Sequence, residues 1–522
     1  MKYRDVIFPA VLAILTLQSA EAGSATWNLD PASNNWNIAT NWTPATVPNG
    51  QSDVATFGVS SATHPFFFEP VELGEIVFNP GASVYTISFD HGRSLNFYGA
   101  GIVNNSGQIQ TLSVTLLRGV TAQILFRNDS SAGDGVVFAI DGPSFFTSLF
   151  FLDSSSAGNS TITLTGGADI YGSHMTFSED SKAGTASIEL NGALTSGAQG
   201  ANTTFFDQAT ADHATFTAHG GTVAGAGGAI LTFATSGAPS AGNATLIADG
   251  NILGADGGLI QFYDDADGGG SRVEVFDNGR LSIENAADSA AIGSLEGNGR
   301  VLLGTNNLTI GLTNASTTFS GRITGTGSGG SGGSITKKGR GRLTLTRSNS
   351  YPGGTTVSGG SLTLNNRNGS ATGSGLVEVE EGTLSGRGII AGGVVLATNG
   401  GQGTLSPGSG RPPSALTILS FLTFHSNSVD QFVFDSSTAQ ANTVVAGAVD
   451  LDPGCSISFR DLGNAVLPLG TTFTVISSTV ADPIFGQFDN LADGSTVTVN
   501  GNKFQADYEG GDGNDLTLTV VP

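Results

Sequence analysis

The sequence predicts an all-β protein in which short strands stack as the coils of a parallel β-helix. Aliphatic residues alternate with threonine in short runs, such as Leu343 to Leu345 and Leu362 to Leu364, as in strands with one buried face. Glycine, proline and asparagine interrupt these runs at short intervals, as tight turns require. A unit of 25 to 30 residues recurs between Phe126 and Phe262. This period is typical of a solenoid coil with three short strands.

The composition supports a packed protein. The chain has 522 residues, of which 77 are glycine and 31 are phenylalanine; the hydrophobic share of 39% is enough for a core. The net charge is −23 with only 20 lysines and arginines, so we expect no nucleic-acid partner. Cys455 is the one cysteine. It cannot form an internal disulfide, and we expect it to be a small buried side chain rather than a reactive thiol.

Residues 1–22 are predicted to be a signal peptide. Lys2 and Arg4 precede an apolar run from Val6 to Leu17, and Ala20-Glu21-Ala22 fits the small-residue cleavage rule with cutting after Ala22. The alternative, a transmembrane anchor, is disfavoured because the apolar run is too short. No second apolar span follows, so we expect a mature chain without a membrane span that is secreted or held at the cell surface.

Residues 23–120 are expected to form an N-terminal cap and the first coils. All three tryptophans, Trp27, Trp36 and Trp42, lie near the mature N-terminus. Large aromatics can cover the apolar end of a solenoid, which has no neighbouring coil. The alternative is a platform on which sugars stack.

Residues 121–284 are expected to form the repeat β-helix. Its unit is a phenylalanine, an acidic or polar turn, a small pair and a strand. The phenylalanines that we assign to this register, expected to stack inside the coils, are Phe126, Phe151, Phe177, Phe206, Phe233 and Phe262. The small pairs, expected to allow one tight turn per coil, start at Ala132, Ala157, Ala183, Ala211, Ala241 and Gly269.

The turns after these phenylalanines carry aspartates: Asp129, Asp153, Asp180, Asp207 and Asp264. Stacked at about 4.8 Å, as in a sheet, they would repel one another unless staggered or screened. We expect solvated side chains that accept bonds from nearby backbone amides. The alternative is a ladder of cations.

Residues 285–405 are expected to continue the β-helix and to include a distinct repeat at 332–366. The segment Ser334 to Asn365 reads SITKKGRGRLTLTRSNSYPGGTTVSGGSLTLN. It resembles the autotransporter-associated β-strand repeat, or passenger-associated transport repeat. The matching positions are Ile335, Thr336, Lys337, Gly339, Gly341, Leu343, Leu345, Asn349, Tyr351, Gly353, Thr355, Val357, Gly360 and Leu362. The resemblance implies a right-handed parallel β-helix exported by a Gram-negative bacterium.

Residues 406–522 are expected to form a C-terminal β-rich region, either a small domain or a cap, after the proline-rich segment from Ser406. Members of the family that export themselves carry a C-terminal membrane barrel, and this segment lacks a series of long strands with an apolar outer face. We therefore expect a passenger without its translocator, dependent on separate export machinery.

Three motifs for chemistry are weak. Gly510 to Asp515 (GGDGND) resembles a calcium nonapeptide, but it occurs once and calcium rolls need tandem turns. Gly329 to Gly333 matches G-x-S-x-G without the strand and helix that a nucleophile elbow requires. The histidines, expected to be ordinary surface residues without metal-binding company, are His64, His91, His174, His213, His219 and His425.

One basic cluster stands out in this acidic chain. It comprises Lys337, Lys338, Arg340, Arg342 and Arg347. A solvated face of the repeat is the simplest interpretation; the alternatives are a protease-sensitive site or a contact for acidic polysaccharide.

These features predict an exported, non-enzymatic repeat protein with a structural or adhesive role at the cell surface or in the extracellular matrix. We expect no catalytic residues, metal or cofactor, and a cell-surface or matrix polysaccharide or protein as partner. The alternative is a secreted polysaccharide lyase or hydrolase on the same fold. Its carboxylates and base would be Asp264, Asp265, Asp267 and Arg272.

Overall fold

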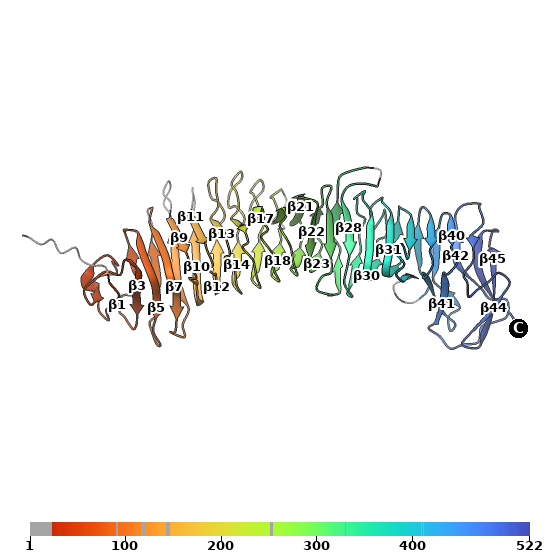
Figure 1. The fold of residues 1–522 in the computed structure, drawn as a ribbon, viewed down its shortest axis with the longest axis horizontal. Coiled ribbons are helices and arrows are strands. Elements are labelled where there is room, and N and C mark those ends of the chain that lie inside the picture. The colour runs from red at the N-terminus through yellow and green to blue at the C-terminus, as the bar shows by residue number, and fades with distance from the viewer. Residues whose placement is uncertain are drawn as a thin grey trace, which may run out of the picture.

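A computed structural model describes residues 23–89, 92–115, 122–141, 147–250, 254–328, 330–408, 410 and 412–522. These residues form a long parallel β-solenoid of about 16 turns (Figure 1). The predicted signal peptide at 1–22 and Gly329 of the G-x-S-x-G match lie outside the described residues. The coils follow one another from the N-terminal to the C-terminal end, as the prediction of a parallel β-helix requires.

Three sheets run along the rod. The first has 14 strands among the described residues, in the order β2-β1-β3-β5-β7-β9-β11-β13-β15-β17-β19-β21-β24-β27. Its strands are β1 (Ala25–Trp27), β2 (Trp42–Thr43), β3 (Gly50–Phe57), β5 (Val71–Phe78), β7 (Ser94–Asn104), β9 (Ala122–Phe126), β11 (Thr147–Phe151), β13 (His174–Phe177), β15 (Asn202–Asp207), β17 (Ile230–Gly237), β19 (Leu259–Asp264), β21 (Arg280–Ala286), β24 (Arg300–Leu302) and β27 (Arg322–Thr324).

The second sheet accompanies the first and continues beyond it. Its strands are β4 (Phe66–Phe67), β6 (Thr86–Phe89), β8 (Gln110–Thr115), β10 (Asp134–Asp141), β12 (Asn159–Leu164), β14 (Ser187–Leu190), β16 (Thr215–Ala218), β18 (Thr245–Ala248), β20 (Arg272–Val275), β22 (Ser289–Ile292), β23 (Ser294–Gly297), β25 (Asn307–Ile310), β26 (Thr317–Phe319), β28 (Ser334–Lys337), β29 (Arg342–Leu345), β30 (Thr355–Leu364), β31 (Val377–Gly386), β33 (Val394–Leu396), β34 (Gly403–Pro407), β36 (Leu422–Phe424), β37 (Val429–Asp435), β38 (Gln440–Ala441), β40 (Val449–Leu451), β41 (Ser456–Asp461) and β43 (Phe485–Gly486).

The third sheet covers the C-terminal end. Its strands are β32 (Ile389–Ile390), β35 (Ala415–Ile418), β39 (Thr443–Ala446), β42 (Thr472–Ser478), β44 (Thr496–Val499), β45 (Asn502–Gly510) and β46 (Asp515–Val520). Pairing is parallel as far as β42 and antiparallel among β42, β46, β45 and β44. This change of direction ends the coil stacking and closes the rod. One 3-10 turn, η1 (Ala39–Asn41), is the helical structure among the described residues.

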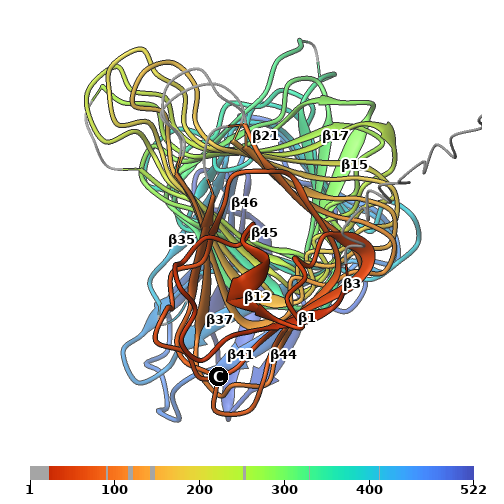
Figure 2. The same ribbon diagram turned by 90° about the vertical axis from the view of Figure 1, so that its left-hand side faces the viewer.

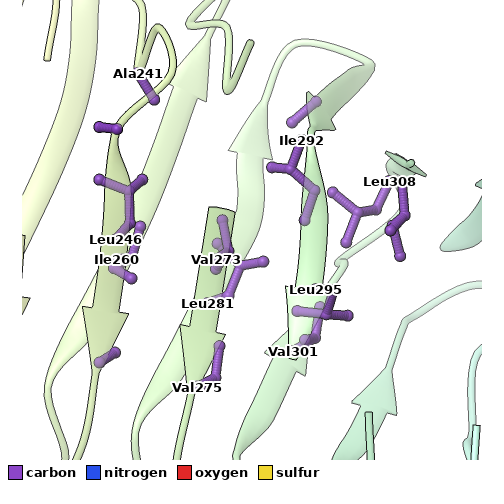
Figure 3. Packing of buried hydrophobic residues seen from close by; sticks show 14 of the residues in the cluster. Ala241, Leu246, Ile260, Val273, Val275, Leu281, Ile292, Leu295, Val301 and Leu308 are labelled. Atoms are coloured by element: carbon purple, nitrogen blue, oxygen red, sulfur yellow. The ribbon is translucent and has the colours of Figure 1, made fainter. Parts of the chain in front are cut away.

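The core is one continuous stack along the inside of the coils. Alternate strand residues point inward, for example Leu246, Val273 and Leu295, which are fully buried and aligned on successive coils. Figure 3 shows such side chains meeting between the strand layers, and Figure 2 shows the coils superimposed around this common interior. Burial of these aliphatic rows is the main stabilising term, because each coil alone exposes its apolar edge to water.

A ladder of phenylalanines runs through the first sheet. The rings of neighbouring coils lie 4.5 to 5.0 Å apart between centroids and 4 to 14° from parallel. The rungs are Phe97, Phe126, Phe151, Phe177, Phe205, Phe233 and Phe262. The expected stacking is confirmed, but the assignment of Phe206 was wrong. Phe177 pairs with Phe205, and a slip of one residue turns a side chain to the opposite face.

The small pairs form the turns at a second corner of the same coils. Bridges align Ser131, Ser156, Lys182, Thr210, Ser240 and Asp267. The sixth pair therefore begins at Gly268 and not at Gly269 as predicted. Gly184 shows why the position is restricted: its φ is +63°, and an added Cβ would lie 2.5 Å from the carbonyl oxygen of Gly158.

The three tryptophans close the N-terminal end. Trp27, Trp36 and Trp42 are at most 2% exposed and pack edge to face, with centroids 4.9 and 4.7 Å apart, over Phe57 of the first coil. The indole N–H groups of Trp27 and Trp42 donate to the carbonyl oxygens of Ala62 and Trp36. The buried rings lie where a cap would cover the first coil. A sugar-stacking platform is excluded for these rings, because no face is open to a ligand.

Candidate functional site

The acidic turns form a ladder of hydrogen bonds between coils. The carboxylate of Asp153 accepts from the Asn128 backbone N–H at 2.8 Å, and Glu179 accepts from Asp153 N–H at 2.5 Å. Asp207 accepts from Glu179 N–H at 3.2 Å. Bonding to backbone amides is as expected, but the amides belong to the preceding coil. The rungs are Asn128, Asp153, Glu179 and Asp207, all at positive φ. Asp264 also has a positive φ and lies two residues after its ladder phenylalanine. The prediction of Asp129 and Asp180 for these positions was wrong by one residue.

The residues proposed for polysaccharide cleavage do not form a constellation. Asp264, Asp265 and Asp267 line a surface hollow of about 290 Å³. Arg272 instead forms a bidentate pair with Glu296, with N–O distances of 3.0 and 3.1 Å, and lies 3.1 Å from Glu274. A base committed to two glutamates is not available to these aspartates.

The calcium-like segment is a turn of the closing sheet. Residues 510–515 connect β45 and β46, and the Asp515 carboxylate accepts the Ser478 backbone N–H at 3.0 Å. The Asn514 side-chain amide donates to the Val480 carbonyl oxygen. These hydrogen bonds hold the turn between β45 and β46 against residues 478–480. Within the described ranges, no group of three or more histidine, cysteine, aspartate or glutamate side chains has a geometry that could hold a metal ion.

His219 is held between two carboxylates from the neighbouring coils. Its Nε2 lies 2.6 Å from Glu189 Oε2, and its Nδ1 lies 3.1 Å from both Asp249 oxygens. Both ring nitrogens face acceptors, so both must donate and the ring is an imidazolium. The hydrogen bond to Asp249 is the main cause that raises the pKa of His219 to about 9, against the opposing effect of burial. The ring lies beside a hollow of about 400 Å³ that Asp277 also lines.

The remaining described histidines have separate partners. His213 contacts Asp212 and His425 contacts Asp452, each at 2.6 Å, and His64 contacts Thr63 at 3.2 Å. His174 bonds Thr176 at 2.8 Å, and burial lowers the pKa of its ring. His91 lies outside the described residues. His219 was expected to be an ordinary surface residue, but it lies between the carboxylates of Glu189 and Asp249.

The predicted basic cluster divides into two parts. Lys337 is 1% exposed, and its ammonium donates to the carbonyl oxygens of Lys338, Gly339 and Gly359 at 2.6, 3.1 and 3.3 Å. Burial lowers its pKa to about 8. The lysine of the repeat motif therefore ties a turn to the next coil and is not part of a solvated face. Lys338, Arg340 and Arg342 are exposed.

Arg347 belongs to a group that the sequence prediction missed, which we name the arginine corner. It consists of Arg322, Arg347, Arg367 and Arg387, all exposed, around a surface hollow of about 760 Å³. Thr346, Ser348, Asn365 and Asn368 complete the lining. Arginines spaced by 20 to 25 residues from Arg280 to Arg387 were the available signal. This signal is weak because the coils differ in length, so the arginines do not recur at one fixed spacing in the sequence.

Pairing of the strands places these arginines at one corner of successive coils. Phe319, Leu345, Leu364 and Gly386 are aligned across four coils. Each arginine of the corner follows its aligned residue by one to three positions. Arg300 and Arg280 extend the line, since Arg322 is in register with Arg300 and Arg300 with Arg280. The stripe therefore crosses six coils.

No helix among the described residues is long and apolar enough to cross a membrane.

Cys455 is a buried free thiol, as predicted, and burial raises its pKa to about 11.

Comparisons with known proteins agree with the repeat. The passenger-associated-transport-repeat family model matches residues 335–364. A stretch of 108 residues is 41% identical to the adhesin BmaC autotransporter of Brucella suis biovar 1, covering 20% of this chain and 3% of that protein. The Haemophilus influenzae Hap adhesin structure aligns over 92% of this chain and 65% of that chain with 10% identity and a TM-score of 0.24, too low to support an argument. The chain therefore carries a passenger-associated transport repeat within its stacked coils and is similar to an autotransporter adhesin over one fifth of its length.

Proposed function

We propose that this protein is an exported, non-enzymatic rod with an adhesive or structural role at the bacterial cell surface or in the extracellular matrix. The observation that carries the proposal is the passenger-type repeat at 335–364, whose strands pair in parallel from β28 through β30 to β31. Stacked coils repeat the same corners along one axis, which suits contact with an extended partner. Its partner would be a cell-surface or matrix polysaccharide or protein.

Export is the second part of the proposal. The signal peptide would be removed after Ala22, and the rod would begin with the tryptophan cap near Trp27. Fractionation of cells, followed by N-terminal sequencing of the mature protein, tests this part. Surface exposure to added protease, with an N-terminus at Gly23, is expected, whereas recovery of an unprocessed chain in the cytoplasm would contradict it.

Adhesion can be tested directly with the purified chain. Beads coated with the protein are expected to bind host cells or matrix more than beads coated with an unrelated acidic β-solenoid. Equal binding by both coatings would contradict the adhesive role.

The alternative function is cleavage of a polysaccharide at the hollow formed by Asp264, Asp265 and Asp267. It is disfavoured because Glu274 and Glu296 engage Arg272. Incubation with a panel of glycans decides between the two functions. Turnover that disappears in Asp264→Ala and persists in the control Asp129→Ala would replace the adhesive proposal with the enzymatic one.

A further inference from the structure

We infer that the arginine corner binds an acidic polysaccharide, through carboxylate or sulfate groups spaced along the polymer. This inference rests on the proposed adhesive function and assigns it a surface and a ligand class. The corner is the hollow lined by Arg322, Arg347, Arg367 and Arg387.

The four guanidinium groups have no anionic partner in the part of the chain that the structure describes. Among the described residues, none of them has a side-chain ion pair or hydrogen bond, whereas Arg272 and Arg280 pair with carboxylates. None of the described residues that line the hollow carries a carboxylate. In a chain with 43 acidic residues and a net charge of −23, a concentration of unpaired positive charge is costly to the isolated protein. A bound anion would remove this repulsion.

The geometry suits a polymer more than a single small anion. Adjacent coils lie about 4.8 Å apart, so the stripe from Arg280 to Arg387 crosses six coils and extends roughly 24 Å. Guanidinium groups bind carboxylate or sulfate through two parallel N–H···O bonds. A row of them along the rod axis can engage successive charged groups of one extended chain.

The neutral part of the lining matches sugar hydroxyl groups. Thr346, Ser348, Asn365 and Asn368 offer hydroxyl and amide groups between the arginines. The Oδ1 atom of Asn365 is buried and has no hydrogen-bond partner among the described residues. A buried acceptor without a partner is unfavourable unless a ligand donor reaches it. A hydroxyl of a bound sugar could supply that donor.

Charge on the rest of the rod restricts where a polyanion can bind. The overall negative field repels polyanions, so binding at the corner should weaken as salt screens the arginines. Duplex DNA shares the anionic chemistry but lacks the hydroxyl pattern and the flexible spacing of a glycan. It therefore serves as the discriminating competitor in the test.

The experiment measures binding of the full chain to polygalacturonate, dextran sulfate, neutral dextran and duplex DNA by biolayer interferometry at low and high salt. The two acidic polysaccharides distinguish carboxylate from sulfate recognition. We expect binding to at least one of them and none to neutral dextran. Arg347→Gln/Arg367→Gln should weaken binding on the order of tenfold, because two charge-assisted contacts are lost.

The matched control changes the same charge in the same repeat. Lys338→Gln/Arg340→Gln removes two exposed basic residues that do not line the hollow, and it should leave affinity within about twofold at fixed salt. A second variant, Arg322→Gln/Arg387→Gln, repeats the test at the ends of the corner. Unchanged circular dichroism and melting temperature establish that each variant folds.

Several results would overturn the inference. They are equal losses in the corner and control variants, binding of duplex DNA as tight as that of the polysaccharides, or no binding to either acidic polysaccharide. The bead assay separates this inference from the adhesive function. Adhesion that persists unchanged in Arg347→Gln/Arg367→Gln would leave an adhesin and remove the arginine corner from its mechanism.

Discussion

The phenyl rings of Phe177 and Phe205 lie face to face on consecutive coils, with centroids 4.5 Å apart and planes 4° from parallel. Both rings are fully buried. Each also stacks on a further ring, Phe151 or Phe233. A middle rung therefore loses two stacking contacts when it is removed.

Phe177→Ala is expected to lower the free energy of unfolding by about 3–5 kcal/mol, because it opens a cavity and breaks both stacks. The control is Phe206→Ala, since Phe206 is half-buried and outside the ladder. Its loss should be less than half as large. Urea titration followed by far-UV circular dichroism measures both changes. Equal losses would show that the ladder adds nothing to ordinary burial.

His219 should make stability depend on pH. Its folded pKa of about 9 exceeds the ordinary 6.5. The contribution is therefore fully present below about pH 6.5 and is lost as pH rises through about 9. The difference in melting temperature between the wild type and His219→Gln should be large near pH 6 and small near pH 10. His213→Gln, whose ring contacts the adjacent Asp212, serves as the control. If the difference in melting temperature between the wild type and His219→Gln did not change with pH, the ionic interaction of His219 with Glu189 and Asp249 would be contradicted.

Lys337 should contribute to stability through the three carbonyl groups that it joins. Lys337→Met keeps the aliphatic stem and removes the ammonium, so three backbone acceptors lose a charged donor. We expect a loss of about 1.5–3 kcal/mol by urea titration. Lys338→Met, at the exposed neighbouring position, should change stability by less than about 0.5 kcal/mol. Similar effects at both positions would indicate that general charge, and not this turn, is responsible.

Asp430 is a destabilising residue inside the rod. It lies in register between Leu405 and Ile457, is fully buried, and neither of its carboxyl oxygens has a hydrogen-bond partner among the described residues. Burial raises its pKa from 3.8 to about 8. The unfolded chain thus ionises first as pH rises, and the folded state becomes less favourable between about pH 4 and pH 8.

Asp430→Leu should therefore raise the melting temperature, with a gain of about 1–3 kcal/mol at low pH that grows toward pH 8. Asp430→Asn also removes the titration but keeps an unpaired polar group, so its gain over the wild type should be smaller than that of Asp430→Leu at each pH and should likewise grow toward pH 8. Thermal melts at about pH 4.5 and pH 8 measure these differences. A lower melting temperature for Asp430→Leu at both pH values would show that the carboxyl has a stabilising role.

The coil architecture was predictable because it depends on local alternation and on period, both of which are visible in the sequence. Register was harder to predict. Phe205 and Phe206 are adjacent and chemically identical, so only the pairing with Phe177 decides which ring is inside. The same uncertainty of one residue affected the turn acids, where Asn128 and Glu179 take the positions that Asp129 and Asp180 were expected to occupy.

Sites that join several coils could not be derived from composition. The carboxylates beside His219 come from residues 30 positions before and after it. The arginine corner combines residues from four coils of unequal length. Conversely, five basic residues close together in sequence separate in space, because Lys337 points inward and Arg347 joins other coils.

The direction of the strands has a mechanical consequence. Strands run across the rod, and the hydrogen bonds that join one coil to the next run along its axis (Figure 1). A pulling force along the axis therefore loads the bonds of the terminal coil first and detaches coils one after another. The coil between Phe177 and Phe205 holds 28 residues, which extend to on the order of 90 Å when pulled straight. A rod under tension would thus lengthen in steps and absorb work before a contact at the arginine corner had to break.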